Sequence, residues 1–76
     1  MSVKVYSTPS CPWCTVLKDY LDSKNVSYED VDVSRNKDAA KEMIKKSGQR
    51  GVPVADINGQ IIVGFNQDAI DRLITA

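Results

Sequence analysis

The chain has no histidine and only two cysteines among its 76 residues. A zinc site is built from about three or four protein ligands, most of them Cys or His. A complete zinc site within one chain is therefore nearly excluded. We expect neither a metal nor a tightly bound organic cofactor.

Neither sign of charge is in excess. Ten Lys and Arg residues balance ten Asp and Glu residues, so the formal net charge is +0 at pH 7. A clear excess of positive charge is what draws a protein to nucleic acids or anionic membranes. The composition therefore gives no reason to expect either partner.

Long apolar runs and a secretory signal are also missing. No apolar stretch approaches the roughly 20 residues that cross a bilayer, and no basic-then-apolar leader opens the chain. A cysteine pair without a secretory signal is typical of the reducing cytosol, where such pairs serve catalysis. We therefore expect a cytoplasmic protein.

The length allows one small domain, residues 1–76. Hydrophobic residues make up 42% of the chain and charged residues 26%, which suits a globular core with an ordinary soluble surface. No repeat, low-complexity segment or linker interrupts it. We expect a single domain that exists as a monomer.

Both cysteines lie in one motif, Cys11-Pro12-Trp13-Cys14. A strand-like run from Val3 to Tyr6 precedes the motif and apolar residues at helical spacing follow it, so it falls at a strand-to-helix turn. Pro12 suits the first helical position, where its missing N–H would have no partner. Residues three apart on a helix have Cβ atoms about 5–6 Å apart, close to the separation that a disulfide tolerates.

This position predicts thiol chemistry. A helix N-terminus carries about half a positive charge and unpaired N–H groups, and both favour a thiolate. Cys11, at the mouth of the helix, is the predicted nucleophile, and Cys14, one turn in, is the predicted resolving thiol. A structural disulfide is the alternative, but so short a loop would remove little chain entropy.

The rest of the pattern predicts an α/β fold. The first two strands are joined through a helix and should pair in parallel, whereas Asn58-Gly59 predicts a hairpin between the last two. The result is a four-stranded mixed sheet flanked by three helices, in the order β-α-β-α-β-β-α, with the cysteine pair at the carboxyl end of the first strand. The expected strands are Ser2–Ser7, Ser27–Val33, Pro53–Ile57 and Gln60–Val63, and the expected helices are Pro12–Lys24, Asn36–Ser47 and one starting at Asn66.

The second helix has clear start and stop signals. Ser34 or Asn36 can cap its N-terminus, and Gly48 ends it. Its predicted inner stripe consists of Ala40, Met43, Ile44 and Ser47.

Three motifs together resemble the glutaredoxin family of the thioredoxin-fold superfamily. They are Cys11-Pro12-Trp13-Cys14 after the first strand, Gly51-Val52-Pro53 before the third, and Gly64-Phe65-Asn66 before the last helix. The resemblance covers essentially the whole chain. It implies a thioredoxin/glutaredoxin fold and thiol-disulfide oxidoreductase activity.

The resemblance also implies which residues bind the substrate. The Val52-Pro53 bond should be cis, leaving the Val52 N–H and C=O to pair with an extended disulfide substrate; a trans proline opening an edge strand is the alternative. Trp13 should line the substrate groove, with packing in the core as the alternative. The other positions that match glutathione contacts or the groove are Gln49, Arg50, Gly64, Phe65, Asn66 and Gln67.

The chain departs from the family pattern at positions where charged side chains would contact glutathione. Many glutaredoxins carry a Lys where this chain has Thr8, and paired acidic residues where it has Asn66 and Gln67. A charge-assisted hydrogen bond is worth about 1.5–3 kcal/mol, so losing one or two would weaken glutathione binding about ten- to a thousandfold. The resemblance thus implies a glutaredoxin fold with partly thioredoxin-like partners.

The predicted function is reduction of protein or glutathione mixed disulfides by dithiol exchange through Cys11 and Cys14, with glutathione as co-substrate. One alternative is an electron donor to a specific enzyme, such as ribonucleotide reductase, that is fed by a flavoprotein thioredoxin reductase. A module that binds an iron–sulfur cluster with the help of glutathione is an alternative of another class. Pro12 beside the nucleophile argues against the cluster.

Overall fold

The computed structural model describes residues 2–74. Its elements follow the predicted order, β-α-β-α-β-β-α. The strands are β1 (Val3–Ser7), β2 (Glu29–Asp32), β3 (Val54–Ile57) and β4 (Gln60–Val63), and the helices are α1 (Pro12–Ser23), α2 (Lys37–Ser47) and α3 (Gln67–Ile74).

The four strands form one mixed sheet in the order β2-β1-β3-β4. β1 pairs with β2 in parallel, as the intervening helix predicted, and with β3 antiparallel. β3 and β4 form the predicted hairpin, in which Asn58 and Gly59 both have positive φ, 52° and 89°. A two-residue turn of this kind needs positive φ at both central residues, which Asn and Gly tolerate.

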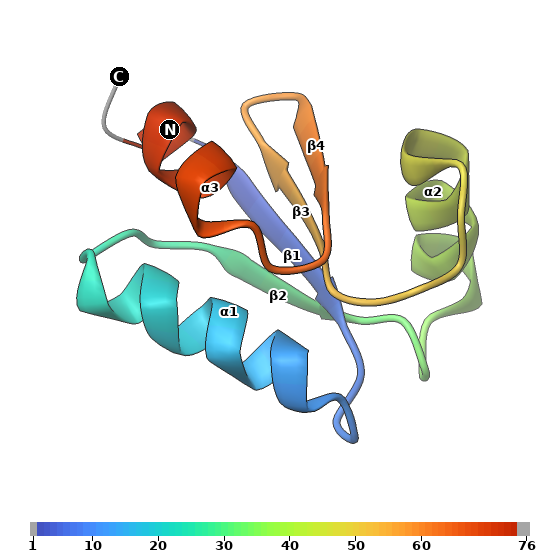
Figure 1. The fold of residues 1–76 in the computed structure, drawn as a ribbon. Helices are drawn as coiled ribbons and strands as arrows, with labels where there is room; N and C mark the ends of the chain where they lie inside the picture. Colours follow the sequence, from blue (N-terminus) through green and yellow to red (C-terminus); the bar gives the residue numbers. More distant parts are fainter. Residues whose placement is uncertain (1, 75–76) are drawn as a thin grey trace.

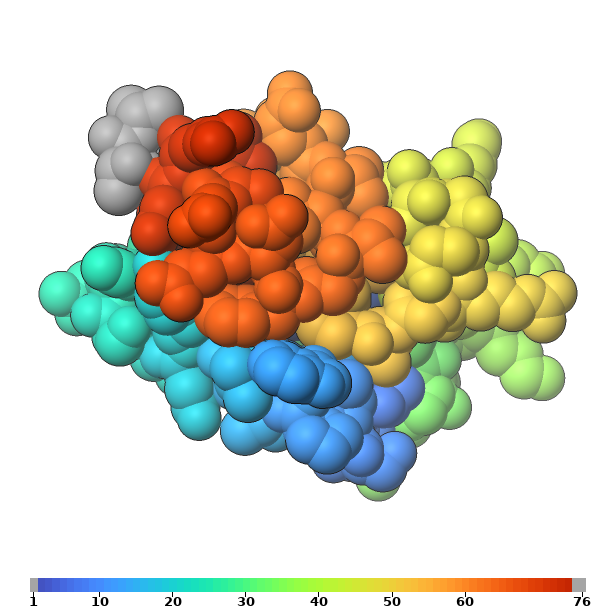
Figure 2. All heavy atoms as spheres, viewed as in Figure 1, coloured from blue at the N-terminus to red at the C-terminus, as the bar shows by residue number. Residues whose placement is uncertain are grey.

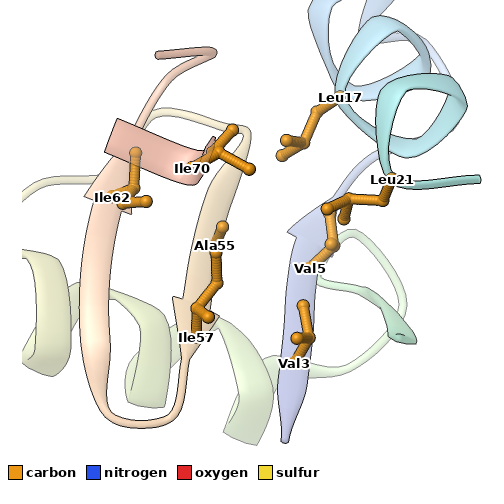
Figure 3. Close-up of a cluster of buried hydrophobic side chains, with 8 residues drawn as sticks. All are labelled: Val3, Val5, Leu17, Leu21, Ala55, Ile57, Ile62 and Ile70. Atoms are coloured by element: carbon orange, nitrogen blue, oxygen red, sulfur yellow. The ribbon is translucent and has the colours of Figure 1, made fainter. Parts of the chain in front are cut away.

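Helices cover both faces of the sheet, as Figure 1 shows: α1 and α3 lie on one face and α2 on the other. β1 is central and therefore buries side chains on both faces. Val3 and Val5 point toward α1 and α3, and Tyr6 points toward α2. The larger core lies under α1 and α3 (Figure 3) and consists of Val3, Val5, Leu17, Leu21, Ala55, Ile57, Ile62 and Ile70.

The smaller core under α2 corrects one prediction. Ala39 and Met43 are the buried residues of this helix, so Ala39 takes the place that the sequence assigned to Ala40. Residues four apart lie on the same helix face, and the face that meets the sheet here passes through positions 39 and 43. Ile44 packs at the edge of this cluster, and Ser47 is half-buried.

The helix ends are set by side-chain caps. Asn36 rather than Ser34 caps α2: its Oδ1 accepts a hydrogen bond from the Ala39 N–H at 3.0 Å. Asn66 caps α3 in the same way, with its Oδ1 3.1 Å from the Ala69 N. α3 therefore begins one residue after the predicted start, because Asn66 is its cap.

The second strand is shorter than predicted. β2 is an edge strand that pairs only with β1, over the four positions from Lys4↔Glu29 to Ser7↔Asp32. Ser27 and Tyr28 therefore lie before the ladder, and Val33 lies after it. Within residues 2–74 no helix has both the length and the apolar character needed to cross a membrane.

Candidate active site

The two cysteines lie at the start of α1, just beyond the carboxyl end of β1. Cys11 is the N-cap of the helix, with extended backbone angles, and Pro12 takes the first helical position. The Cys14 backbone N–H donates a hydrogen bond to Cys11 Sγ at 3.2 Å. In this capping geometry an N–H group of the helix N-terminus points at the sulfur, which stabilises negative charge on it.

The two thiols differ in exposure. Both are free thiols; Cys11 is half-buried, whereas Cys14 has no exposed surface. Burial first, and the neighbouring Cys11 second, raise the pKa of the Cys14 thiol to about 11. Cys14 is therefore protonated at neutral pH, which suits a thiol that reacts second and only with the sulfur beside it.

A polar cluster that the sequence did not reveal lies beside Cys14. Lys18 is one turn further along α1, and its Nζ is 3.0 Å from Asp30 Oδ2 on β2. Asp30 also accepts a hydrogen bond from the buried Ser7 hydroxyl at 2.7 Å. Burial opposes ionisation of Asp30, but the hydrogen bonds from Ser7 and Lys18 outweigh it and lower the pKa of this carboxyl. A backbone hydrogen bond with Thr8 and, to a smaller extent, the ammonium held in this way lower the pKa of Cys14 and so partly offset its burial.

The segment before β3 faces Cys11 from the other side. The Val52–Pro53 peptide bond is cis, as the resemblance implied. Cys11 Sγ lies 3.9 Å from the Val52 carbonyl oxygen. Within residues 2–74, the Val52 N–H makes no hydrogen bond. The Val52 backbone is therefore placed beside the nucleophile, where an extended chain could pair with it.

An apolar groove of about 270 Å³ opens next to this peptide. It is lined by Trp13, Val52, Pro53, Gly64 and Phe65, of which none is charged. Figure 2 shows this face, where the start of α1 in blue meets the segment before β3 in yellow and the segment before α3 in orange. A hollow of about 580 Å³ lies at the far end of α1, lined by Asp22 and residues 25–28, and contains no thiol.

Trp13 is a groove residue, and the core alternative is wrong. Its side chain is 61% exposed, and its ring is stacked against Phe65 with centroids 6.4 Å apart. Phe65 in turn packs edge-to-face on Tyr20 of α1 at 5.6 Å, and the Tyr20 hydroxyl donates to Asp71 of α3. Tyr20 therefore packs against the groove residue Phe65 without lining the groove itself. This contact depends on how α1 packs against α3 and could not be predicted from the sequence.

Four of the predicted contacts, Gln49, Arg50, Asn66 and Gln67, are not among the residues that line this groove. Arg50 and Gln67 are exposed, and the Gly64 N–H donates to the Pro53 carbonyl at 2.8 Å. Asn66 uses its side chain as the cap of α3. Gln49 turns back onto the backbone of Gly51. In the described part of the chain no group of three or more His, Cys, Asp or Glu residues could hold a metal ion.

The fold and the site together define a thioredoxin-fold protein with a CXXC dithiol at a helix N-terminus. The glutaredoxin family model matches residues 3–62, most of the chain. The protein belongs to the glutaredoxin family. Its fold and family are those of thiol oxidoreductases.

Three relatives place the chain within this group. It is 53% identical over 72 residues to an uncharacterised glutaredoxin-like 8.6 kDa protein in the rubredoxin operon of Clostridium pasteurianum, covering 95% of this chain and 96% of that protein. It is 38% identical over 63 residues to glutaredoxin 3 of Escherichia coli, covering 83% and 76%. The NrdH-redoxin of Escherichia coli, described as a glutaredoxin-like protein with a thioredoxin-like activity profile, superposes with a TM-score of 0.86 at 27% identity, covering 96% of this chain and 95% of that one.

Proposed function

We propose that the protein reduces protein disulfides by dithiol exchange, in the cytoplasm and as a monomer, with glutathione as a weaker partner. The observation that carries the proposal is the pairing of a capped, accessible Cys11 with a buried Cys14 at one helix N-terminus. The Cys14 N–H stabilises charge on Cys11 Sγ at 3.2 Å, and the carbonyl of Val52 lies on the other side of that sulfur.

The exchange takes two steps. The Cys11 thiolate attacks one sulfur of a substrate disulfide; that S–S bond breaks, the second substrate sulfur leaves as a thiolate and takes up a proton, and Cys11 is left in a mixed disulfide. Cys14 then loses its proton and attacks Cys11 Sγ, which releases the remaining substrate thiolate. The dithiol has given two electrons to the substrate and has become the Cys11–Cys14 disulfide.

The second step is local because the two sulfurs belong to one helical turn. The attack of Cys14 on Cys11 is intramolecular, and the Thr8 backbone and Lys18 lower the cost of forming the Cys14 thiolate. Neither step requires a metal or an organic cofactor. A reductant must return two electrons to the Cys11–Cys14 disulfide after each turnover, and glutathione or a flavoprotein reductase can supply them.

The groove supports a preference for protein substrates. All five lining residues are uncharged, whereas glutathione at neutral pH carries two carboxylates and one ammonium. An apolar groove beside the Val52 backbone suits an extended polypeptide that pairs its main chain there and places an apolar side chain in the groove. Thr8 and Asn66 stand where the family commonly has charged contacts, and Asn66 Oδ1 is already engaged with the Ala69 N–H.

Restoring the missing charges should improve glutathione use more than it improves protein-disulfide reduction. Thr8→Lys and Asn66→Asp should each raise kcat/KM for a glutathione mixed disulfide about 1.4- to fivefold, because a partly exposed ion pair contributes about 0.2–1 kcal/mol. Asp caps a helix as well as Asn does, so the cap of α3 should survive. Steady-state kinetics with both substrate classes measure the effect.

Salt and a neutral variant provide the controls for this experiment. The gain should shrink at 1 M salt, because the Debye length there is only about 3 Å and the ion pairs are screened. Thr8→Gln lengthens the side chain without charge and should give no gain. Failure of the wild type to reduce any protein disulfide would rule out the proposed function, and equal efficiency with both substrates would rule out the preference.

A further inference from the structure

Gln49 folds its side chain back onto the backbone of Gly51. Gln49 Nε2 donates to the Gly51 carbonyl oxygen at 2.9 Å, and the Gly51 N–H donates to Gln49 Oε1 at 2.6 Å. The carboxamide therefore pairs with both the N–H and the C=O of a single residue, much as a neighbouring strand would. Because one donor and one acceptor of a planar amide are used together, this pairing fixes the direction of the Gly51 backbone.

Hydrogen bonds of Ser47 also connect the loop that contains Gln49 and Gly51 to the end of α2. Ser47 Oγ lies 2.7 Å from the Met43 carbonyl oxygen and 3.0 Å from that of Gln49, and it accepts a hydrogen bond from the Gln49 N–H at 3.4 Å. Gly48 stops the helix in the left-handed conformation, with φ of 74°. The segment that leads from α2 to Gly51 is thus held at both ends by hydrogen bonds.

A side chain on Gly51 would displace the carboxamide of Gln49. A Cβ atom on Gly51 would lie 2.8 Å from Gln49 Oε1, closer than real Cβ contacts come. The φ angle of Gly51 is not in the left-handed region that favours glycine, so conformational freedom is not what this position requires. The Gln49 carboxamide ends a flexible side chain and could move aside, but only by giving up its hydrogen bonds to Gly51.

This segment carries the peptide that faces the nucleophile. Val52 follows Gly51 directly, its carbonyl oxygen is 3.9 Å from Cys11 Sγ, and it lines the groove together with Pro53. A shift of the Gly51 backbone would therefore move the Val52 N–H and C=O relative to Cys11. Displacements of about 1 Å in a positioning element can cost a large part of a catalytic rate.

We propose that Gln49 is a positioning residue: it fixes Gly51, and through it the Val52 backbone that holds the substrate beside Cys11. Both polar ends of its carboxamide are engaged with Gly51. Gln49 Nε2 also donates to Ser47 Oγ at 3.4 Å, so both of its N–H groups are engaged, and direct binding of the glutathione carboxylate would break one of these bonds. The inference rests on the proposed function, because it assigns Gln49 a part in the binding of a disulfide substrate by Val52.

The test uses Gln49→Ala and Gln49→Glu. Alanine removes both hydrogen bonds, whereas glutamate keeps an acceptor for the Gly51 N–H and loses the donor to the Gly51 carbonyl. Gln49→Ala should raise KM for a protein disulfide about two- to tenfold, the value of a neutral hydrogen bond or two, with a smaller change in kcat. Gln49→Glu should fall between it and the wild type.

A structural readout separates positioning from direct contact. Hydrogen exchange of the Gly51 amide, followed by NMR, should be slow in the wild type and faster in Gln49→Ala, because the bond that protects it is gone. The rate at which iodoacetamide alkylates Cys11 should change less than KM does, since so small a reagent does not pair with the Val52 backbone. Comparison of thermal midpoints shows whether either variant is only partly folded.

The fit between Gln49 and Gly51 provides a second, independent measurement. Gly51→Ala should impair protein-disulfide reduction in the wild type and much less in the Gln49→Ala background, because the clashing carboxamide is absent there. Additive effects of the two substitutions would overturn the proposal, as would an unchanged Gly51 exchange rate in Gln49→Ala. A loss confined to glutathione substrates would also overturn it, by showing direct contact. Failure of the proposed function itself would show separately, as a wild type that does not reduce protein disulfides.

Discussion

Cys11→Ser should abolish disulfide reduction, whereas Cys14→Ser should complete the first step and stop at a mixed disulfide. Serine has no thiolate to form, so the first variant cannot attack a disulfide sulfur. The second variant keeps Cys11 Sγ and the backbone N–H of residue 14 that hydrogen-bonds to it at 3.2 Å. It lacks only the buried thiol that would release the substrate.

The measurement is the mass of the protein after incubation with a protein disulfide. Cys14→Ser should gain the mass of one substrate thiol on Cys11, and Cys11→Ser should gain none. Thr15→Ser, a similarly small change at an exposed neighbouring position of α1, serves as the matched control and should turn over like the wild type. Accumulation of a mixed disulfide on Cys14 of the Cys11→Ser variant would reverse the assignment of the two roles.

Reduction through a flavoprotein thioredoxin reductase should be about tenfold faster than reduction through glutathione. The groove has no charged lining residue, and the family's charged positions are occupied by Thr8, Asn66 and Gln67. At these exposed or partly exposed positions each missing ion pair is worth about 0.2–1 kcal/mol, so the three together amount to as much as about 3 kcal/mol, and 1.4 kcal/mol is a factor of about ten. A reductase that presents a polypeptide disulfide can instead use the Val52 backbone and the apolar groove.

A coupled assay that follows NADPH oxidation decides between the two reductants. The same oxidised protein substrate is supplied with thioredoxin reductase in one arm, and with glutathione and glutathione reductase in the other, with each reductase in excess. The variant with both Thr8→Lys and Asn66→Asp should gain more in the glutathione arm than in the thioredoxin reductase arm. Equal rates in the two arms, or a faster glutathione arm, would show that the missing charges do not set partner choice.

The sequence predicted those parts of the site that depend on local signals. Pro12 marks the start of a helix, so the position of Cys11 as its cap followed from neighbouring residues alone. The Asn58-Gly59 hairpin and the start of α3 near Asn66 were predictable for the same reason, because each depends on a few adjacent residues, whereas the cap of α2 was left open between Ser34 and Asn36. The Val52–Pro53 position came from the family resemblance and not from local chemistry.

The features that the sequence could not supply join residues far apart in the chain. The bond between Lys18 and Asp30 depends on how α1 lies over β2, and the contact of Tyr20 with Phe65 depends on how α1 meets the segment before α3. The direction of the Gln49 side chain could not be predicted from the sequence either. A Gln beside an Arg matches a ligand-binding pattern equally well whether it points outward or back at its own loop, and only the structure distinguishes the two.

The most direct test of the dithiol assignment is the alkylation of each thiol in the reduced wild-type protein as a function of pH. At pH 7, iodoacetamide should modify Cys11 and leave Cys14 unmodified, since a thiol with a pKa of about 11 is ionised in only about one molecule in ten thousand at that pH. Modification of Cys14 should rise about tenfold with each pH unit toward its pKa of about 11. Peptide mass spectrometry locates the label. Labelling of Cys14 before Cys11 at pH 7 would contradict the assignment of Cys11 as nucleophile and Cys14 as resolving thiol.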